Sequence, residues 1–281
     1  MRCEEDGRQG KTACPLSTLA KGGAKGGLRA GDSRGIITGH TNVGNADLRS
    51  LHHRKVNEMR FAVFVSGNGS NLQAIIEAVK SSEINAELAL VFSDRRKAYA
   101  LKRAEAAGIK TLCLERKDYI SPQSYEREII IYLKQASIDF LVLAGYMRIL
   151  TPFFVKEYPQ KILNIHPSIL PAFKGTRAIK DTFTYGCKTA GVTVHFVDEK
   201  MDHGPIILQE AFKMAEDETL QSLEERVHKL EHKLYPKAIA LFVEGRLKIK
   251  GRKVKILDKP SIRPPGPKTN LTAQDTPAPV E

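Results

Sequence analysis

The stretch RFAVFVSGNGSNLQAII, residues 60–76, contains an apolar run, a turn rich in glycine and the start of an amphipathic helix. Every position from 61 to 65 is apolar, which is typical of a strand that is covered on both faces. The apolar positions after Asn71 instead recur with the spacing of one helix face. The stretch therefore predicts a strand, a tight turn and a helix, which together open a βαβ unit.

The same alternation of short apolar runs and helical patterns continues to residue 145. Strand-like runs are AELALVF (86–92), KTLCL (110–114) and DFLVLAG (139–145), and helix-like patterns lie at 71–82, 97–108 and 122–137. Strands that are apolar throughout need helices over both faces of their sheet. We therefore predict an α/β fold with a doubly wound, mostly parallel sheet flanked by helices. Ligands of such sheets bind at the carboxyl ends of the strands.

Beyond residue 160 the sequence predicts further strands and two helices. The strands are KILNI (161–165), AGVTVHFVD (190–198) and IILQEAFKM (206–214), and the helices lie near 177–186 and from about 219 to 243. The last segment, RLKIKGRKVKIL (246–257), alternates apolar and basic residues about Gly251. This pattern predicts a closing hairpin whose outer face carries the lysines.

The two ends of the 281-residue chain differ from its middle in composition. Residues 1–58 hold ten of the 21 glycines and no apolar periodicity, so we predict a disordered extension. Residues 258–281 are rich in proline and predict a loose tail. The domain prediction is thus a single folded domain at 59–257 with disordered ends.

The formal net charge of +12 first suggests a nucleic-acid partner, but residues 1–58 and 246–281 carry most of it. Residues 59–245 hold 25 Lys and Arg against 23 Asp and Glu, so the middle of the chain is nearly neutral. A groove that tracks phosphates would need basic residues clustered in the folded part. We therefore expect no nucleic-acid partner.

Neither a metal site nor a membrane span is predicted. The four cysteines, Cys3, Cys14, Cys113 and Cys187, form no CxxC pair and no cluster with histidine at metal-ligand spacing. No run approaches the roughly 20 apolar residues that a membrane span requires, and the N-terminus has no apolar signal core. We expect a cytoplasmic protein without a metal; its oligomeric state is not predicted.

The turn at residues 67–71 has the composition of a phosphate-binding loop. Glycines at 67 and 69 allow a tight turn and a close approach to an anion, and Ser70 and Asn71 can cap the helix that follows. A dinucleotide fingerprint would need a third glycine where Leu72 stands, and the Walker lysine is absent too. The loop thus suits a monophosphate, although a turn that only connects strand to helix remains an alternative.

A polar pair interrupts the apolar run ILNIHPSILP (162–171). Asn164 and His166 are two positions apart, so on a strand they face the same space, and Pro167 then ends regular pairing. Asp198, Glu199 and Asp202 precede a Gly-Pro turn, and Asp202 is our choice for the carboxylate that supports a positively charged His166. The alternatives are a core histidine and an aspartate that only caps its turn. His195, mid-strand, is interpreted as buried support.

Five segments together resemble the phosphoribosylglycinamide formyltransferase family of purine biosynthesis. They are SGNGSNLQAI (66–75), VLAGYMRIL (142–150), LNIHPSILPAFKG (163–175), GVTVHFVDEKMDHGPIILQ (191–209) and LEHKLYP (230–236). The resemblance covers about residues 60–257, in order and with fitting spacing. It implies a Rossmann-like formyltransferase fold and transfer of a formyl group from 10-formyltetrahydrofolate, the co-substrate, to the amine of a glycinamide ribosyl phosphate. Neither a metal nor a nicotinamide takes part in that family.

The resemblance also implies roles for individual residues. The catalytic residues would be Asn164, His166 and Asp202. The acceptor would bind Gly69, Ser70, Asn71 and Glu231, and the folate donor would bind Met147, Arg148, Ile149 and Leu150.

The sequence departs from the family pattern at two places. Many members have a donor-holding arginine where our alignment places Pro122, so donor contacts there are not carried over. The family loop after FKG often has a histidine, whereas this chain has Arg177 and Ile179 in that region. Contacts of that loop are not carried over either.

Three other functions are alternatives. Methionyl-tRNA formyltransferase and formyltetrahydrofolate deformylase share this chemistry. The first would need a C-terminal RNA-binding domain in place of residues 258–281, and the second a regulatory α/β domain in place of residues 1–58. A non-catalytic module that binds phosphoribosyl or folate groups would have Asn164 and His166 as polar core. Retained binding with unchanged turnover in His166→Ala would favour that module or a different catalyst.

Overall fold

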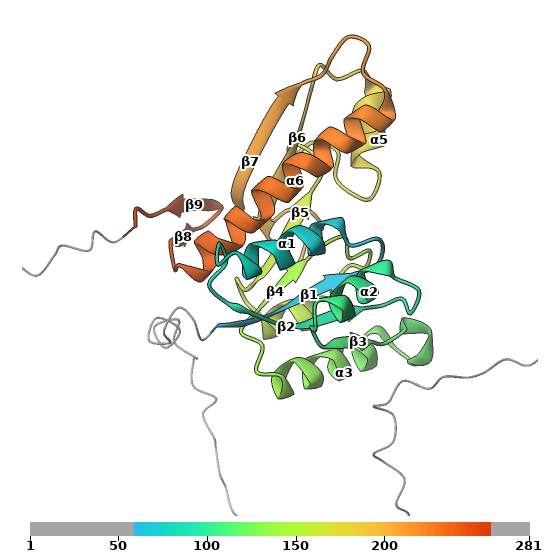
Figure 1. Cartoon of the computed structure of the whole chain (residues 1–281), viewed down its shortest axis with the longest axis vertical. Coiled ribbons are helices and arrows are strands. Elements are labelled where there is room, and N and C mark those ends of the chain that lie inside the picture. Colours follow the sequence, from blue (N-terminus) through green and yellow to red (C-terminus); the bar gives the residue numbers. More distant parts are fainter. Residues whose placement is uncertain (1–58, 260–281) are drawn as a thin grey trace, which may run out of the picture. The chain divides into compact units, whose positions relative to one another are not determined.

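The computed structural model describes residues 59–259 (Figure 1). The predicted extension at 1–58, and the predicted tail from residue 260 on, lie outside the described residues. The boundaries of the predicted domain therefore stay a prediction.

Five strands form the parallel part of the sheet, in the order β3 (Thr111–Cys113), β2 (Glu87–Ser93), β1 (Arg60–Val65), β4 (Phe140–Leu143) and β5 (Ile162–His166). The chain first moves outward from β1 to β3 and then returns to the other side of β1 with β4. This reversal is the switch point at which doubly wound sheets bind ligands. The prediction of an α/β fold with a doubly wound, mostly parallel sheet is confirmed.

An antiparallel extension continues the sheet beyond β5. Strand β6 (Thr189–Phe196) pairs antiparallel with β5, and β7 (Ile206–Lys213) pairs antiparallel with β6. At the far edge lies a hairpin of β8 (Leu247–Lys250) and β9 (Lys253–Ile256), which turns at Gly251 with a φ of +59°. The hairpin joins the sheet through β9, which pairs with β7.

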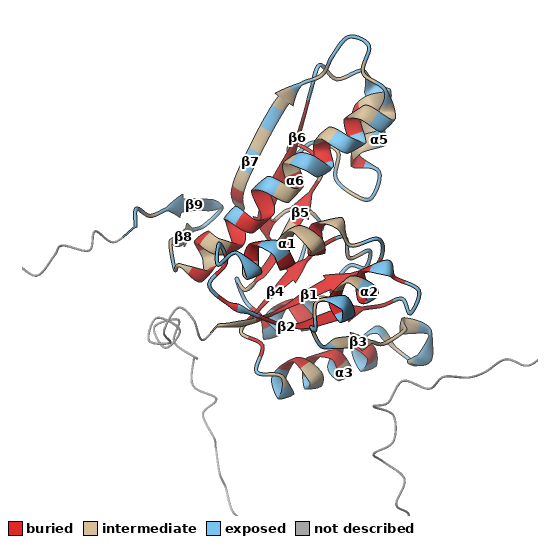
Figure 2. Cartoon of the chain, in the orientation of Figure 1, coloured by how far each residue is buried: buried red, intermediate tan, exposed pale blue. Residues whose placement is uncertain are grey.

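Helices cover both faces of the parallel strands, as Figure 1 shows. The helices over the parallel strands are α1 (Ser70–Lys80), α2 (Tyr99–Ala106), α3 (Pro122–Gln135), α4 (Pro152–Glu157) and α6 (Leu220–Val243). Helix α5 (Ala178–Tyr185) packs against α6, and a short 3-10 turn, η3, lies at Arg116–Asp118. Side chains of β1 alternate between the two faces: Phe61 packs with α1, α2 and α6, whereas Phe64 packs with α3 and α4. Figure 2 shows the resulting buried layer along the central strands.

One buried tyrosine ties the long helix α6 to the sheet beside the switch point. The hydroxyl of Tyr235 lies 2.8 Å from the carbonyl oxygen of Leu143 and 3.0 Å from that of Leu163. Because Tyr235 is fully buried, burial raises its pKa well above the ordinary value, and the hydroxyl remains a donor. This contact fixes α6 across β4 and β5.

Candidate functional site

A pocket opens at the carboxyl ends of β1, β4 and β5, where the switch point lies. Loops after these strands form its walls, together with the loop between β6 and β7 and one face of α6. All the residues predicted for the site line this pocket: Gly69, Ser70, Asn71, Met147, Arg148, Ile149, Leu150, Asn164, His166, Asp202 and Glu231. The structure therefore brings the whole predicted set together, from segments up to 162 positions apart.

The ring of His166 lies at the end of β5 with an oxygen near each nitrogen. Its Nε2 is 2.8 Å from the carbonyl oxygen of Phe173, and its Nδ1 is 3.6 Å from Oδ2 of Asp202. A carbonyl oxygen can only accept, so Nε2 carries a proton in this geometry. Nδ1 is then the nitrogen that can gain or lose a proton. The 3.6 Å gap to Asp202 is longer than a hydrogen bond and leaves Nδ1 accessible to another partner.

The backbone around Asp202 is held in an uncommon conformation. Its φ is +48°, in the left-handed region of backbone conformation that residues other than glycine rarely adopt. The backbone N–H of Gly175 donates to its Oδ2 at 2.8 Å. This bond couples the loop after β5 to the loop between β6 and β7, and it aims the carboxylate at His166.

Asn164 stands opposite a second histidine. In the antiparallel pairing of β5 with β6, Asn164 faces His195, and Nδ2 of the amide is 3.2 Å from Nε2 of the ring. Nδ1 of His195 is 2.7 Å from the carbonyl oxygen of Phe196. Asp202 also lies nearby, with its Oδ1 3.9 Å from Nε2 of His195. The rings of His166 and His195 thus both lie beside the Asp202 carboxylate.

The glycine loop differs from its prediction in one respect. The N-cap of α1 is Gly69, with a φ of +77°, and no side chain makes a capping hydrogen bond there. The expectation that Ser70 or Asn71 caps the helix is therefore wrong: both lie inside α1, and Asn71 turns toward α6 instead. The first N–H groups of the helix therefore have no side-chain acceptor. They can donate to a bound anion.

Asn71 and α6 form a small polar cluster. The amide of Asn71 donates to Oε2 of Glu231 at 3.0 Å, and Nδ1 of His228 lies 2.9 Å from the same oxygen. Glu231 is 4% exposed. Among residues 59–259, the Oδ1 of Asn71 is a buried oxygen that receives no hydrogen bond. The cluster can thus accept hydrogen bonds from a polar ligand in the pocket.

A buried carboxylate holds the loop that follows β4. Asp94 accepts from Ser66 Oγ at 2.6 Å and from Arg148 Nε at 2.8 Å, while Ser66 Oγ accepts from the N–H of Met147 at 2.9 Å. The loop leaves Met147 and Ile149 exposed beside the pocket and buries Leu150. An apolar wall with a few fixed polar groups suits a flat organic ligand.

The two departures from the family pattern, at Pro122 and at Arg177 and Ile179, lie outside this pocket. Pro122 is the first residue of α3, after the N-cap Ser121, and it does not line the pocket. Arg177 lies at the N-cap position of α5, 3.6 Å from Asp181. Neither side chain reaches the residues that were predicted for catalysis.

Four polar residues of the site were given no functional role from the sequence: Ser66, Asp94, His195 and His228. The sequence signal for His195 would have been its place in a strand that pairs with β5, but the register of that pairing cannot be read from the sequence alone. His228 lies three residues before Glu231 on the same helix, and this spacing is the usual sequence signal for two side chains that interact on one helix face.

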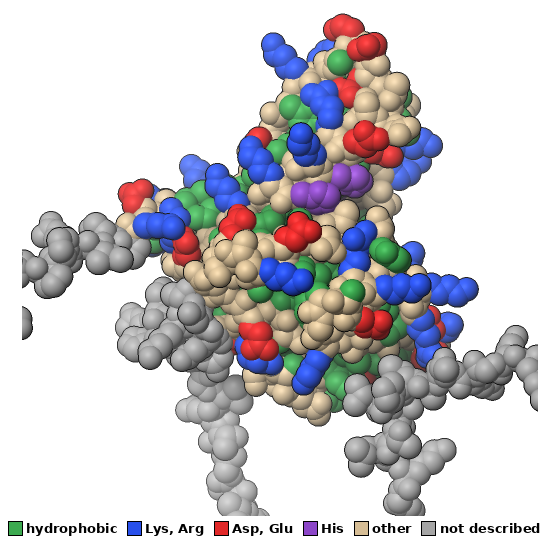
Figure 3. Space-filling view, in the orientation of Figure 1, with side chains coloured by type: hydrophobic (Ala, Val, Ile, Leu, Met, Phe, Trp, Pro, Cys, Tyr) green, Lys and Arg blue, Asp and Glu red, His purple; other side chains and the backbone are tan. Residues whose placement is uncertain are grey.

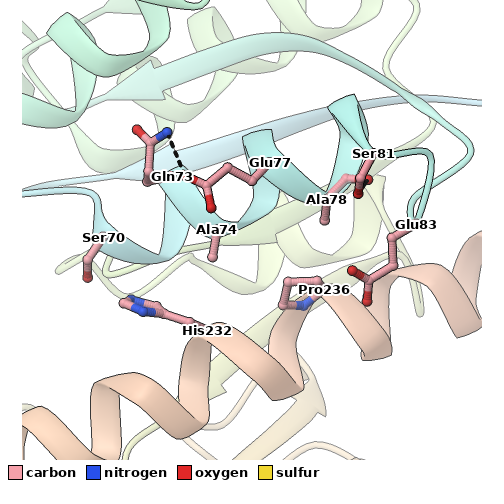
Figure 4. A pocket seen from close by; sticks show the side chains of 9 residues that line it. All are labelled: Ser70, Gln73, Ala74, Glu77, Ala78, Ser81, Glu83, His232 and Pro236. Atoms are coloured by element: carbon pink, nitrogen blue, oxygen red, sulfur yellow. Dashed lines mark hydrogen bonds between the residues drawn. The ribbon is translucent and has the colours of Figure 1, made fainter.

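A second hollow lies between α1 and α6. Figure 4 shows its lining, with Ser70 and His232 at one end and Glu83 at the other. Only Ser70 of the predicted residues borders it. Figure 3 shows acidic side chains interspersed among basic ones over this face, with histidine side chains above α6. We place the candidate site in the switch-point pocket, because the predicted residues converge there.

Two absences hold for the part of the chain that the structure describes. Within 59–259, no three or more His, Cys, Asp and Glu side chains are grouped as metal ligands would be. Within the same residues, no helix has the length and apolar character to cross a membrane.

Comparisons with known proteins give a consistent result. The formyl transferase family pattern matches residues 59–239. The chain is 46% identical over 180 residues to phosphoribosylglycinamide formyltransferase of Bacillus subtilis, covering 64% of this chain and 92% of that protein. It is 44% identical over 188 residues to the trifunctional purine biosynthetic protein adenosine-3 of Drosophila melanogaster, covering 66% of this chain but 14% of that protein. The crystal structure of glycinamide ribonucleotide transformylase 1 from Symbiobacterium toebii is similar with a TM-score of 0.70 and 44% identity, covering 72% of this chain and 95% of that one.

Proposed function

Because the chain belongs to the phosphoribosylglycinamide formyltransferase family, we propose that it transfers a formyl group from 10-formyltetrahydrofolate to the amine of 5-phosphoribosylglycinamide, in purine biosynthesis. Both substrates are small molecules, and the reaction needs no metal. The observation that carries the proposal is the convergence of Asn164, His166 and Asp202 with the glycine loop in one pocket.

The reaction requires the protein to stabilise two charges that develop, one on the carbonyl oxygen and one on the attacking nitrogen. The acceptor amine attacks the formyl carbon, and a C–N bond forms while the carbonyl oxygen becomes negative and the nitrogen positive. The bond from that carbon to N10 of the folate then breaks, and the proton lost by the amine passes to N10. The protein must therefore supply donors to the oxygen and a path for the proton.

Three side chains suit these tasks. The amide of Asn164 and the Nδ1–H of charged His166 donate to the oxygen. Asp202, 3.6 Å from Nδ1, stabilises the positive charge on the ring. Because Nε2 stays bonded to the carbonyl oxygen of Phe173, Nδ1 handles the proton, directly or through a water.

The substrates occupy the two ends of the pocket. The acceptor phosphate binds at the start of α1, at Gly69, Ser70 and Asn71, and its polar groups reach Glu231. The folate lies against the loop of Met147, Arg148, Ile149 and Leu150. Holding both substrates in one pocket aligns the amine with the formyl carbon.

The experiment follows ¹³C-formyl from 10-formyltetrahydrofolate into phosphoribosylglycinamide, with wild type and His166→Ala. We expect wild type to form the labelled product and His166→Ala to lose roughly 10²–10³-fold in kcat, with KM for the donor little changed. His232→Ala, a histidine that borders the other hollow, is the matched control and should keep wild-type kcat. Equal kcat in wild type and His166→Ala would refute the role of His166, and no labelled product from wild type would refute the function.

A further inference from the structure

The pairing of β5 with β6 places a buried histidine against the proposed catalytic amide. Asn164 and His195 are direct cross-strand partners, so their side chains project from the same face of the sheet. The 3.2 Å between Nδ2 of Asn164 and Nε2 of His195 is a hydrogen-bond distance. His195 is 2% exposed, so no water competes freely for this contact.

The surroundings of His195 decide which nitrogen carries its proton. Nδ1 lies 2.7 Å from the carbonyl oxygen of Phe196, which can only accept, so Nδ1 is protonated. Nε2 of the neutral ring then has a lone pair that faces the Asn164 amide. Burial lowers the pKa of His195 below its ordinary value, which keeps the ring neutral near pH 7.

A lone pair on Nε2 selects one orientation of the amide. The two ends of a carboxamide have almost the same shape, and only their hydrogen-bond partners distinguish them. An acceptor at Nε2 draws in the Nδ2 end, whereas a flipped amide would set Oδ1 against the lone pair. With one N–H bonded to His195, the second N–H of the same nitrogen has no partner among residues 59–259.

We propose that His195 is a positioning residue, which holds the Asn164 amide with its free N–H toward the oxygen of the transferred formyl group. This inference rests on the proposed function, since it assigns a task to His195 only if Asn164 donates to that oxygen. A flipped amide would present Oδ1 to the developing negative charge and would repel it. His195 thus acts on the reaction through Asn164.

The test is a double-mutant cycle on the full chain, with ¹³C-formyl transfer as the readout. His195→Leu removes the acceptor at similar volume, and His195→Gln restores an acceptor oxygen. Each is made in wild type and in Asn164→Ala, and the folded state of each variant is checked by its thermal melting. We expect His195→Leu to lower kcat by roughly 10–10²-fold with both KM values little changed, and His195→Gln to recover most of kcat.

The decisive result is the effect of His195→Leu in the Asn164→Ala background. We expect no further loss of kcat there, because the amide to be positioned is already gone. The same fold-loss in both backgrounds, or wild-type kcat in His195→Leu, would overturn the inference. If His195→Leu does not fold, a fully folded His195→Gln that loses kcat as strongly as Asn164→Ala overturns it as well. An Asn164→Ala variant with wild-type kcat would instead refute the proposed catalytic role of Asn164.

Discussion

The fold itself requires glycine at position 69, because of the backbone conformation there and the close approach of Ala100. The φ of Gly69 is +77°, and a Cβ built there would lie 2.6 Å from the Cβ and 2.9 Å from the Cα of Ala100 in α2. Gly67, in the same loop, has no atom within 4 Å of such a Cβ and no positive φ. A side chain at position 69 therefore tests packing, whereas one at position 67 tests the approach of the acceptor phosphate.

We expect Gly69→Ala to lower the free energy of unfolding by about 1–2 kcal/mol or more, from the left-handed backbone and the contact with Ala100. Gly67→Ala should leave that free energy within about 0.5 kcal/mol of wild type and raise KM for the acceptor. Urea denaturation and steady-state kinetics measure the two quantities. An unchanged acceptor KM in Gly67→Ala would remove the phosphate from this side of the loop.

His228 is a titratable partner of Glu231 in the pocket. Its Nδ1 lies 2.9 Å from Oε2 of Glu231, and this hydrogen bond raises the pKa of His228 above its ordinary 6.5. A histidine with a raised folded-state pKa binds more protons in the folded protein than in the unfolded one. Its stabilisation is therefore fully present below pH 6.5 and is lost as the pH rises through the raised pKa.

The prediction is that wild type exceeds His228→Gln in unfolding free energy at low pH and that the difference disappears toward high pH. Urea denaturation of both proteins from about pH 5.5 to 9 measures it. Lys229→Gln, which removes a neighbouring positive charge of α6, is the control and should show no such pH dependence. A difference that grows with pH would contradict the assigned ion pair.

At the scale of elements, the loop after β4 depends on a carboxylate from the end of β2. Asp94 is 4% exposed and binds both Ser66 and Arg148, so it connects three segments of the parallel sheet. The sequence placed residues 147–150 at the site only through the resemblance. Asp94 was missed, because nothing in the sequence indicates that the end of one strand supports the loop of another.

Asp94→Asn keeps the shape and removes the charge that holds Arg148. We expect KM for the donor to rise roughly 3- to 10-fold, the effect of losing one partly exposed charged hydrogen bond, while KM for the acceptor stays near wild type. Lys97→Gln removes an exposed positive charge three positions further on and serves as the control. An equal rise of both KM values would indicate a general loss of structure instead of a displaced donor loop.

For the whole molecule, the fold followed from the apolar strands and the helices between them. The contacts of the candidate site did not follow in the same way. Asn164 and His166 share a face because side chains two positions apart on a strand point to the same side, and this spacing can be read directly from the sequence. The contacts of Asn164 with His195, and of Asn71 with Glu231, depend on register and on packing across 31 and 160 positions. Local patterns do not encode such distances, so only the resemblance led to Glu231.

The central claim is that Asp202 and His166 act as a pair on the transferred formyl group. The most direct test is the single-turnover rate of formyl transfer in Asp202→Asn, with donor and acceptor both saturating. The account predicts a rate lower than wild type by about 10²-fold or more, because the neutral amide no longer stabilises charged His166. A wild-type rate in Asp202→Asn, with the variant fully folded, would contradict it.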